Sequence, residues 1–365
     1  MRKSDIREKI KKSRILYFTY KKITDRDYLR GYKEYLSGHN LKSKETIRKE
    51  ISLIKKYWNC DPMHYYRYRL FEKELSYDEL LDYVPSYYFY NYYNPGIYDN
   101  IDLSDTYSKI SMHNYFIKKK IETPAHIAII RKGIIYENSN NKIIFEELAG
   151  KLLKSNNRLF FVKPDKGRGG KGIFTIEKSD NGLYIDGKAL NEKLFMDKIK
   201  YKDFVLQEGI SQRIDIKKIN PSSVNTLRVI TQYFKNCYKI SVVVLRIGRN
   251  NAFVDNSAQG GISVNLDIEN GRFSKYAYTE HTNERFEKHP DTNFIFEGYV
   301  INDWDKIKLC ILDFANKAFE FPEVAWDIAI LDDKISVIEI NTYYGIEHLQ
   351  CCIGGMRRRL NVEPN

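Results

Sequence analysis

Residues 323–341 contain two carboxylates and a carboxamide, Asp327, Glu339 and Asn341, that the sequence pattern is expected to bring together. Two apolar segments there flank the polar residues 332–334, which predicts a β-hairpin with those three residues in the turn. In this hairpin Asp327 stands opposite Glu339, and strand alternation places Asn341 on the same face as Glu339. Such an oxygen cluster beside apolar strands favours a hard divalent cation, of which Mg²⁺ is the usual one beside phosphates. The alternative is a solvent-facing polar stripe on an amphipathic hairpin.

A basic, glycine-rich segment lies near the middle of the chain. A predicted strand over residues 158–164 is followed by four glycines within residues 165–172, and residues 173–176 resume an extended pattern. Glycines expose backbone N–H groups and allow close approach to an anion. A strand follows rather than a helix, so we expect a hairpin that folds over phosphates rather than a strand–loop–helix nucleotide motif. A flexible turn is the alternative. The candidate phosphate-binding residues are Lys163, Gly167, Arg168, Gly169, Gly170 and Lys171.

Two further strands supply candidate ligand contacts. The end of a predicted strand over residues 203–210 offers backbone groups to the edge of a base, with Gln207 or Glu208 taking the exocyclic amine. On the next predicted strand Arg228 alternates with apolar residues, so its side chain is expected to face inward. An inward arginine is either ion-paired structurally or directed at a ligand oxyanion. Beside a phosphate site we favour the oxyanion.

The composition describes a soluble globular protein. The 365 residues are 42% hydrophobic and 30% charged, and this length suits two or three subdomains. No apolar run approaches the length that a bilayer span needs. The five cysteines are scattered and show no metal-ligand spacing, which indicates a reducing, cytoplasmic location.

The first sixth of the chain is strongly basic. Residues 1–60 carry a net charge of +11, out of +12 for the whole chain. Ile47, Ile51, Ile54 and Trp58 recur there at helical spacing, and basic residues cover much of the remaining surface. One interpretation is a helix docked on the body with a solvated basic face. The other is contact with an anionic polymer or an anionic membrane surface, which would make the protein peripheral at the inner face of a membrane. No recognition motif supports nucleic acid as a partner.

Tyrosine dominates the following segment. Residues 61–100 contain 11 tyrosines, and this segment is our candidate linker between the basic region and the body. Rings with one polar edge suit packing between subdomains, which we expect for most of them, and also stacking on sugars.

The order of these motifs resembles the ATP-grasp superfamily. The resemblance rests on Lys163 with its glycine loop, the Gln207-Glu208 strand end, Arg228, and Asp327 followed by Glu339-Ile340-Asn341. More narrowly, residues 220–228, residues 254–256 with Gly260-Gly261, and residues 326–329 are similar to the sugar-transfer-associated ATP-grasp family. The similarity spans about residues 105–355.

The resemblance implies an α+β ATP-grasp fold in which two α+β lobes enclose ATP. The expected division is a mainly helical region over residues 1–100 and an ATP-grasp domain over residues 101–365. The central lobe would span about residues 155–210, and the C-terminal lobe about residues 211–365.

The resemblance also implies roles for the candidate residues. Lys163 would contact the phosphates of ATP under the closed glycine loop, and Gln207, Glu208, Gly209 and Ile210 would hold adenine. Asp327, Glu339 and Asn341 would bind one or two Mg²⁺ ions. Spacing suggests Asp215 for the ribose, and Lys109 and Lys118 are both candidates for a second phosphate-binding lysine.

The activity implied is that of an ATP-dependent carboxylate–amine ligase. Such enzymes phosphorylate a carboxylate and let an amine displace the phosphate. Lys163 would neutralise the γ-phosphate, and Arg228 would stabilise the acyl phosphate and the tetrahedral oxyanion. The family name points to bacterial surface polysaccharide, such as capsular polysaccharide, with a sugar acid or glycan precursor as the carboxylate. The alternatives are a phosphotransferase and a non-catalytic ATP-binding scaffold for glycosyltransferases.

Overall fold

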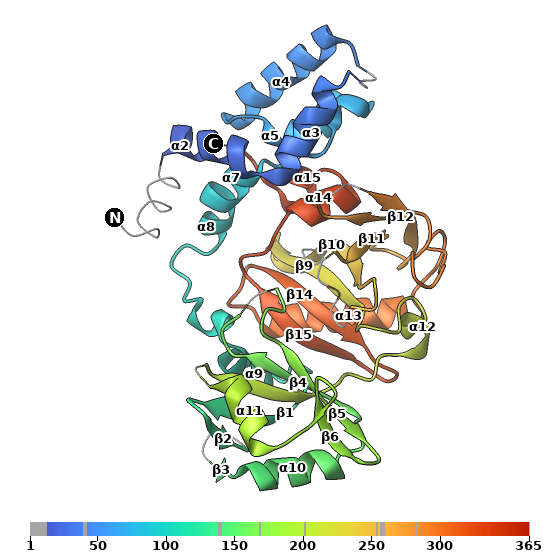
Figure 1. Ribbon diagram of the computed structural model, residues 1–365. Coiled ribbons are helices and arrows are strands. Elements are labelled where there is room, and N and C mark those ends of the chain that lie inside the picture. The colour runs from blue at the N-terminus through green and yellow to red at the C-terminus, as the bar shows by residue number, and fades with distance from the viewer. Residues whose placement is uncertain are drawn as a thin grey trace. The chain divides into compact units, whose positions relative to one another are not determined.

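The computed structural model divides into two compact units (Figure 1). The first unit comprises Met1–Asp99, Tyr278–Arg285 and Gly345–Asn365, and the second comprises Asn100–Ala277 and Phe286–Tyr344. This division has the expected boundary near residue 100. Two later segments, which we assigned to the ATP-grasp domain, belong instead to the same unit as the N-terminal residues. The residues that the structure describes are 13–38, 42–137, 141–167, 169–200, 202–252, 255, 260–281 and 284–364.

The described part of the first unit is mainly helical. Its helices include α2 (Arg14–Thr24), α3 (Arg26–Leu36), α4 (Lys44–Trp58), α5 (Met63–Arg67), α6 (Tyr77–Leu81), α7 (Ser86–Tyr88), α8 (Asn94–Ile97), α14 (Glu347–Ile353) and α15 (Arg357–Leu360). The predicted basic helix is confirmed as α4. Ser43 caps its first turn, and Ile47, Ile54 and Trp58 are buried along one face.

The tyrosine-rich segment packs within the first unit and is not a linker. The rings of Tyr65 and Tyr68 are buried, which confirms packing as the role of these residues. The buried Gln350 on α14 shows why the C-terminal residues belong to this unit. Its amide donates to Tyr68 Oη at 3.0 Å and to the Val84 carbonyl at 2.9 Å.

The second unit contains an eight-stranded antiparallel sheet in the order β3-β2-β1-β8-β4-β5-β6-β7. Its strands are β1 (His126–Arg131), β2 (Ile134–Tyr136), β3 (Lys142–Ile143), β4 (Leu159–Pro164), β5 (Phe174–Ser179), β6 (Gly182–Ile185), β7 (Lys188–Ala189) and β8 (Phe204–Glu208). The helices α10 (Phe145–Lys154) and α11 (Glu192–Ile199) contribute Leu148, Leu152 and Phe195 to the hydrophobic core on one face. The other face carries Lys163 and Gln207, because these residues alternate with the buried ones.

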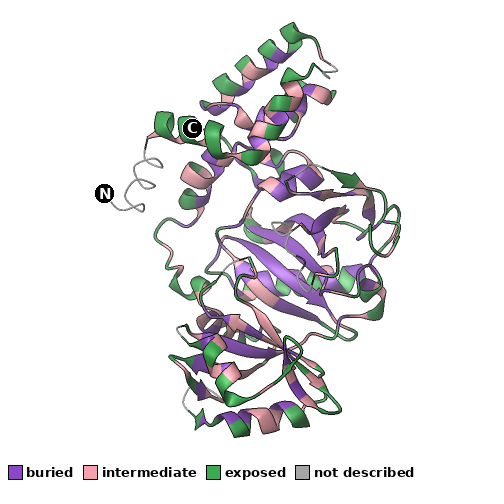
Figure 2. Ribbon diagram, viewed as in Figure 1, coloured by how far each residue is buried: buried purple, intermediate pink, exposed green. Residues whose placement is uncertain are grey.

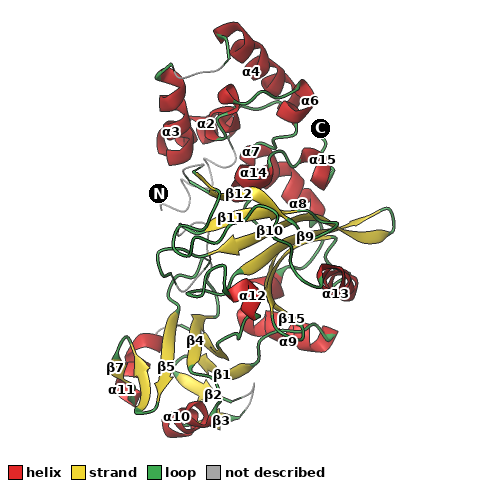
Figure 3. Cartoon of the chain, turned by 90° about the vertical axis from the view of Figure 1, so that its right-hand side faces the viewer, coloured by secondary structure: helices red, strands yellow, loops and turns green. Residues whose placement is uncertain are grey.

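A seven-stranded sheet follows in the order β13-β12-β11-β10-β9-β14-β15 (Figure 3). Its strands are β9 (Thr226–Phe234), β10 (Cys237–Ile247), β11 (Ile262–Leu266), β12 (Phe273–Thr279), β13 (Arg285–Phe286), β14 (Glu323–Ile330) and β15 (Ile335–Asn341). Helix α13 (Trp304–Lys317) packs on its apolar face, where Leu227 and Trp326 meet Phe314. The central strands β9 and β14 are buried over most of their length (Figure 2).

Helix α9 (Lys109–Lys119) packs against the cores of both sheets. Ile110 packs with Ile129 and Val205 of the eight-stranded sheet, whereas Met112 and Phe116 join the core of the seven-stranded sheet. The second unit is therefore an α+β structure in which one helix contributes to both hydrophobic cores. Within the described residues, no helix is long and apolar enough to span a bilayer.

Candidate nucleotide and acyl-transfer site

The predicted late hairpin is confirmed as β14 and β15. The strands flank a turn closed by the Leu331 N–H, which donates to the Lys334 carbonyl at 2.8 Å. Asp327 pairs with Glu339 on β15 and also with Arg228 on β9. Directly paired residues share a face of a sheet, so Arg228, Asp327 and Glu339 form a polar row across three strands.

Asp327 forms a buried ion pair with Arg228. Arg228 Nε lies 2.5 Å from Asp327 Oδ1 and Nη2 lies 3.0 Å from Oδ2, while Arg246 Nη2 on β10 lies 3.2 Å from Oδ2. Burial by itself would raise the pKa of Asp327, but the two guanidinium groups outweigh it and lower the pKa. Arg228 is thus inward-facing, as predicted, and it is ion-paired. The sequence analysis did not identify Arg246.

Glu339 and Asn341 provide oxygens on the same face. Asn341 Nδ2 donates to Glu339 Oε1 at 3.4 Å. Burial raises the pKa of Glu339, and the adjacent Asp327 carboxylate raises it further, whereas Lys109 and Arg228 act in the opposite direction. Two carboxylates that repel one another beside a carboxamide suit a divalent cation, whose charge would favour the ionised form of both.

The fit to Mg²⁺ therefore centres on Glu339 and Asn341. Asp327 is more constrained because Arg228 engages both of its oxygens, although a carboxylate oxygen has a second lone pair to offer. In the described part of the chain, no cluster of three or more His, Cys, Asp or Glu side chains is arranged to hold a metal.

Two lysines from different elements lie near Glu339. The pKa of Lys163 on β4 is lowered to about 8, because burial and the charge of Lys109 lower it more than the charge of Glu339 raises it. Lys109 Nζ donates to the Gly167 carbonyl of the glycine loop at 3.0 Å. Lys118 is exposed further along α9. Of the two candidates for the second phosphate-binding lysine, Lys109 is the one that contacts the glycine loop.

Asp165 holds the start of α9 against the glycine loop. This buried carboxylate accepts hydrogen bonds from Ser108 Oγ at 2.8 Å and from the Ile110 N–H at 3.0 Å. Its own carbonyl accepts from the Lys109 N–H at 3.2 Å. The loop and Lys109 are thereby positioned together. The sequence analysis missed this contact because a glycine loop and a helix start 56 residues apart carry no local signal for it.

The glycine loop joins β4 and β5, which confirms the predicted hairpin. Gly169, Gly170 and Gly172 all have positive φ angles of 67–79°. A Cβ on Gly172 would lie 3.3 Å from Pro164 Cγ, so a side chain there meets both backbone strain and crowding. Lys171 is exposed beside these glycines, and Arg168 lies outside the described residues.

At the end of β8, the side chains of Gln207 and Glu208 lie on opposite faces of the sheet. Gln207 shares its sheet face with Lys163, and its side-chain amide lies 3.5 Å from the Pro124 carbonyl. Glu208 points to the opposite face, where Ser155 Oγ donates to its carboxylate at 2.9 Å. Gln207 is therefore the side chain on the site face.

Gly209 follows directly and packs tightly against β4. Its N–H donates to the Leu159 carbonyl at 2.8 Å, and an added Cβ would lie only 2.7 Å from the same oxygen. Ile210, the last residue assigned to the adenine, is partly buried and follows the strand. The segment after β8 is thus held close to β4 by a contact that only glycine permits.

A stacked pair of histidines also lies on this face of the eight-stranded sheet. His126 pairs with Gln207, and its ring stacks on His113 of α9 with centroids 3.8 Å apart. Burial, with smaller contributions from His113 and Lys163, lowers the pKa of His126 to about 3, so His126 is neutral at pH 7. Isolated histidines gave no signal in the sequence.

Both carboxylate oxygens of Asp215 bond to protein groups. Arg213 Nε and Nη2 lie 2.6 and 2.9 Å from its two oxygens, and the Ile216 N–H donates to Oδ1 at 2.9 Å. Tyr299 Oη adds a contact to Oδ2 at 3.3 Å. These contacts hold the start of α12 (Ile214–Lys217), so we assign Asp215 a structural role in place of ribose binding.

The lowered pKa of Lys163 predicts a pH dependence of nucleotide affinity. Lys163 is protonated below about pH 8 and loses its charge above that value, so the affinity for ADP is expected to fall between pH 7 and pH 9. Lys163→Arg stays charged and is expected to flatten this profile. Calorimetric titrations with ADP at both pH values measure the effect. Equal affinities of the wild type at the two values would contradict it.

Comparisons with known proteins give one family and several distant solved structures. The model of the sugar-transfer associated ATP-grasp family matches residues 87–362. Among solved structures, the chain is similar to D-alanyl-alanine synthetase A from Vibrio cholerae O1 biovar eltor (12% identity, 72% of this chain and 61% of that one, TM-score 0.40). It is also similar to D-alanine-D-alanine ligase from Helicobacter pylori (14%, 70% and 57%, TM-score 0.37). A third is N5-carboxyaminoimidazole synthase from Aspergillus clavatus in complex with ADP and 5-aminoimidazole ribonucleotide (13%, 68% and 51%, TM-score 0.35).

The solved structures are distant, and this chain spans between about half and three fifths of their lengths. The comparison with curated proteins gives no match. The family model, in contrast, covers more than half of the chain and includes both sheets. The predicted family and the predicted α+β ATP-grasp fold are therefore confirmed: the chain belongs to the sugar-transfer associated ATP-grasp family.

Proposed function

We propose that this protein is an ATP-dependent carboxylate–amine ligase that works through an acyl phosphate. The observation that carries the proposal is the grouping of Lys109, Lys163 and Glu339, which come from α9, β4 and β15 and interact electrostatically. Two cations beside a carboxylate suit a triphosphate and its counter-ion. The ion pair of Arg228 with Asp327 lies on the adjacent strands. Membership of an ATP-grasp family supports the same class of enzyme.

Residues at different positions in the site contact different parts of the nucleotide. Lys109 and Lys163 bind phosphate oxygens beneath the glycine loop, whose backbone N–H groups and exposed Lys171 add further donors. Glu339 and Asn341, with Asp327, would hold Mg²⁺, which would supply neutralisation of phosphate charge. Gln207, Gly209 and Ile210 position the adenine.

Arg228 and Arg246 are the groups that we assign to the transferred acyl group. Both guanidinium groups lie on the polar face of the seven-stranded sheet, and Asp327 bonds to both of them. Two fixed cations stabilise the negative charge that develops on an acyl phosphate and on a tetrahedral oxyanion. Their ion pairs restrict the side chains in advance, so little reorganisation accompanies the reaction.

For the substrates, we propose a sugar acid or a carboxylated glycan precursor and an amine. The product would be an amide used in bacterial surface polysaccharide. The family description associates these proteins with sugar transfer, which supports a carbohydrate acceptor. We propose a cytoplasmic site of action, where ATP is supplied.

The test is ADP release from a panel of sugar acids and amines, followed by mass spectrometry of the product. A ligase releases ADP and phosphate only when both an acid and an amine are present, and the product mass equals acid plus amine minus water. A stable phosphorylated product would instead identify a phosphotransferase. Binding of ATP without turnover across the panel would identify a scaffold. Either of these results would contradict the ligase.

We also propose that the basic face of α4 binds an anionic acceptor, such as a glycan polymer, a lipid-linked precursor or a membrane surface. Lys55 and Lys56 are exposed in the last turn, whereas Ile54 and Trp58 are buried on the opposite face. Exposed charges of this kind act over about 10 Å at moderate ionic strength.

Reversal of this charge is expected to weaken only the use of anionic acceptors. The double variant Lys55→Glu/Lys56→Glu should raise the KM for a polyanionic acceptor several-fold and leave kcat on a small acid unchanged. The matched control is Lys306→Glu, which changes an exposed lysine on α13. Equal acceptor use by the wild type and the double variant would make the basic face structural.

A further inference from the structure

The first unit contains a cavity of about 80 Å³ that the proposed ligase chemistry does not use. Its walls come from α2, α3, α5, α7 and α14 and the segments that flank them. They include the rings of Tyr17, Tyr87 and Tyr90 and the carboxylates of Asp25, Asp61 and Glu347. This volume admits a ligand of about six non-hydrogen atoms, at roughly one water-sized atom per 10–15 Å³.

Carboxylates outnumber cations around this cavity. The cationic groups in the lining are Lys21 and Arg67, against the three carboxylates. Arg67 is shared between Asp25, at 3.2 Å, and Asp27, at 2.7 Å. Lys21 Nζ lies 3.7 Å from Asp25. The cations of the lining are thus directed to Asp25 and its neighbour Asp27. Lys22, which lies outside the lining, has its Nζ 2.6 Å from Asp61.

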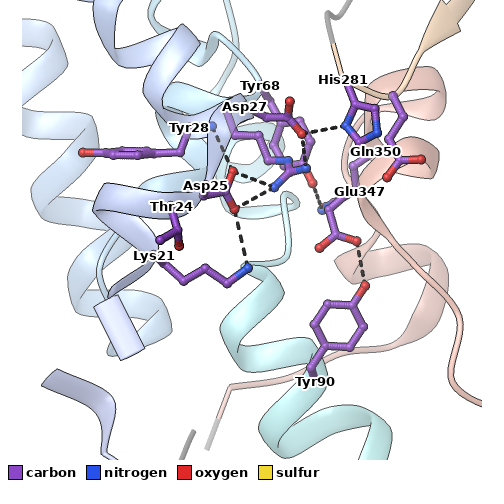
Figure 4. Close-up of polar contacts among 12 residues, drawn as sticks. Lys21, Thr24, Asp25, Asp27, Tyr28, Tyr68, Tyr90, His281, Glu347 and Gln350 are labelled. Atoms are coloured by element: carbon purple, nitrogen blue, oxygen red, sulfur yellow. Dashed lines mark hydrogen bonds and ion pairs between the residues drawn. The ribbon is translucent and has the colours of Figure 1, made fainter. Parts of the chain in front are cut away.

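Glu347 is held by a neutral donor. Tyr90 Oη donates to Glu347 Oε2 at 2.6 Å, and Figure 4 shows the other carboxylate oxygen directed away from Tyr90. In the same view Lys21, Asp25, Tyr90 and Glu347 surround a common space. A hydrogen bond from a phenol orients a carboxylate without neutralising it, so Glu347 keeps its negative charge, which also acts on Arg67 and raises the pKa of that guanidinium.

Neighbouring titratable groups also respond to the charge of Glu347. Burial raises the pKa of Glu280, His281 opposes the rise, and Glu347 adds to it. Burial lowers the pKa of His64, another residue of the lining, to about 3, so its imidazole is neutral at pH 7. Among the described residues neither nitrogen of His64 has a hydrogen-bond partner. The lining therefore has a net negative charge that no histidine offsets.

The aromatic rings add a preference for organic cations. The rings of Tyr17 and Tyr87 lie 4.8 Å apart, and Lys21 Nζ already lies 5.9 Å over the ring of Tyr17. The faces of aromatic rings attract cations, and most strongly where water is excluded. Metal ions lack the apolar surface that would pack on these rings.

We propose that this cavity is a binding site for a small organic ammonium ion. The charge would face Glu347, and the alkyl groups would pack on Tyr17 and Tyr87. The site lies wholly within the first unit, so the proposal stands independently of the ligase activity.

Calorimetric titration of the full-length protein with choline, at a fixed concentration of KCl, tests the proposal. Choline has a neutral carbon isostere, dimethylbutanol, in which carbon replaces the charged nitrogen. We expect choline to bind at least ~10-fold more tightly than dimethylbutanol. A charge interaction of about 1.4 kcal/mol is enough to produce a tenfold difference in affinity. No binding of choline, equal binding of the two compounds, or preferred binding of a neutral monosaccharide would overturn the proposal.

Two variants with matched controls locate the binding. Glu347→Gln keeps an acceptor for Tyr90 but removes the charge, and we expect it to weaken choline binding at least ~10-fold. Glu363→Gln, an exposed glutamate of the C-terminal segment, should leave the binding unchanged. Should Glu347→Gln fail to fold, Tyr17→Leu replaces it, with the exposed Tyr20 of the same helix changed to leucine as the control. Unchanged choline affinity in the folded cavity variant would overturn the proposal.

Discussion

Replacing Glu339 with glutamine is expected to reduce Mg²⁺-dependent turnover by roughly 100-fold or more while leaving the fold intact. Glutamine keeps the acceptor that Asn341 contacts but removes the negative charge that would bind the cation. Steady-state ADP release at increasing Mg²⁺ concentration measures the loss. Glu177→Gln, an exposed change on β5, is the matched control and should retain full activity. Turnover equal to that of the wild type in Glu339→Gln would remove the metal assignment.

The stability of the same variant separates this role from a structural one. The pKa of Glu339 is raised in the folded protein, so the ionised carboxylate is less favourable there than in the unfolded chain. The free energy of unfolding of the wild type therefore falls as pH rises through this raised pKa. Glu339→Gln lacks that loss and is expected to be at least as stable as the wild type at pH 7. Urea unfolding of both proteins measures it. Marked destabilisation of the variant would contradict the assignment.

The parts of the site that follow from local pattern were predictable. The late hairpin is one example, because strand alternation and a three-residue polar turn together place Asp327 opposite Glu339. The glycine loop is another, since the extended residues on either side of it require a β-hairpin. In both cases the interacting residues lie within about 20 positions, where periodicity and turn chemistry carry the information.

The contacts that depend on strand order were not predictable. Strand β14 inserts between β9 and β15, which brings Arg228 and Arg246 to Asp327. Nothing in the neighbourhood of either arginine specifies this pairing, because β9 and β14 lie about 100 residues apart in the chain. The choice between Lys109 and Lys118 was open for the same reason. It depends on the contact of Asp165 with the first turn of α9.

The assignment of Asp215 to the ribose rested on spacing along the chain alone. Asp215 was placed at the ribose by its distance along the chain, but the neighbouring Arg213 binds both carboxylate oxygens. The two residues are only two positions apart, so their pairing is local. A nearby opposite charge is thus a signal that would have argued against a ligand role for Asp215.

The ion pair of Arg228 with Asp327 leads to the second large expected effect, which is on stability. Asp327→Asn leaves Arg228 and Arg246 without their shared carboxylate in a buried site, and it should lower the free energy of unfolding by about 3–5 kcal/mol. Asp332→Asn, in the exposed turn of the same hairpin, is the matched control and should change it little. Urea unfolding of the three proteins at pH 7 measures the difference.

The sign of the pH dependence distinguishes an ion pair from a simple loss of packing. The pKa of Asp327 is lowered in the folded state, so its stabilising contribution is present at neutral pH and is lost as pH falls through that lowered value. The difference between the wild type and Asp327→Asn should therefore shrink in acid. Adding Arg228→Gln to Asp327→Asn should restore part of the stability, because the unpaired buried charge is removed, but not the activity. A stability difference that is independent of pH, or a double variant less stable than either single one, would show that Asp327 acts through packing rather than charge.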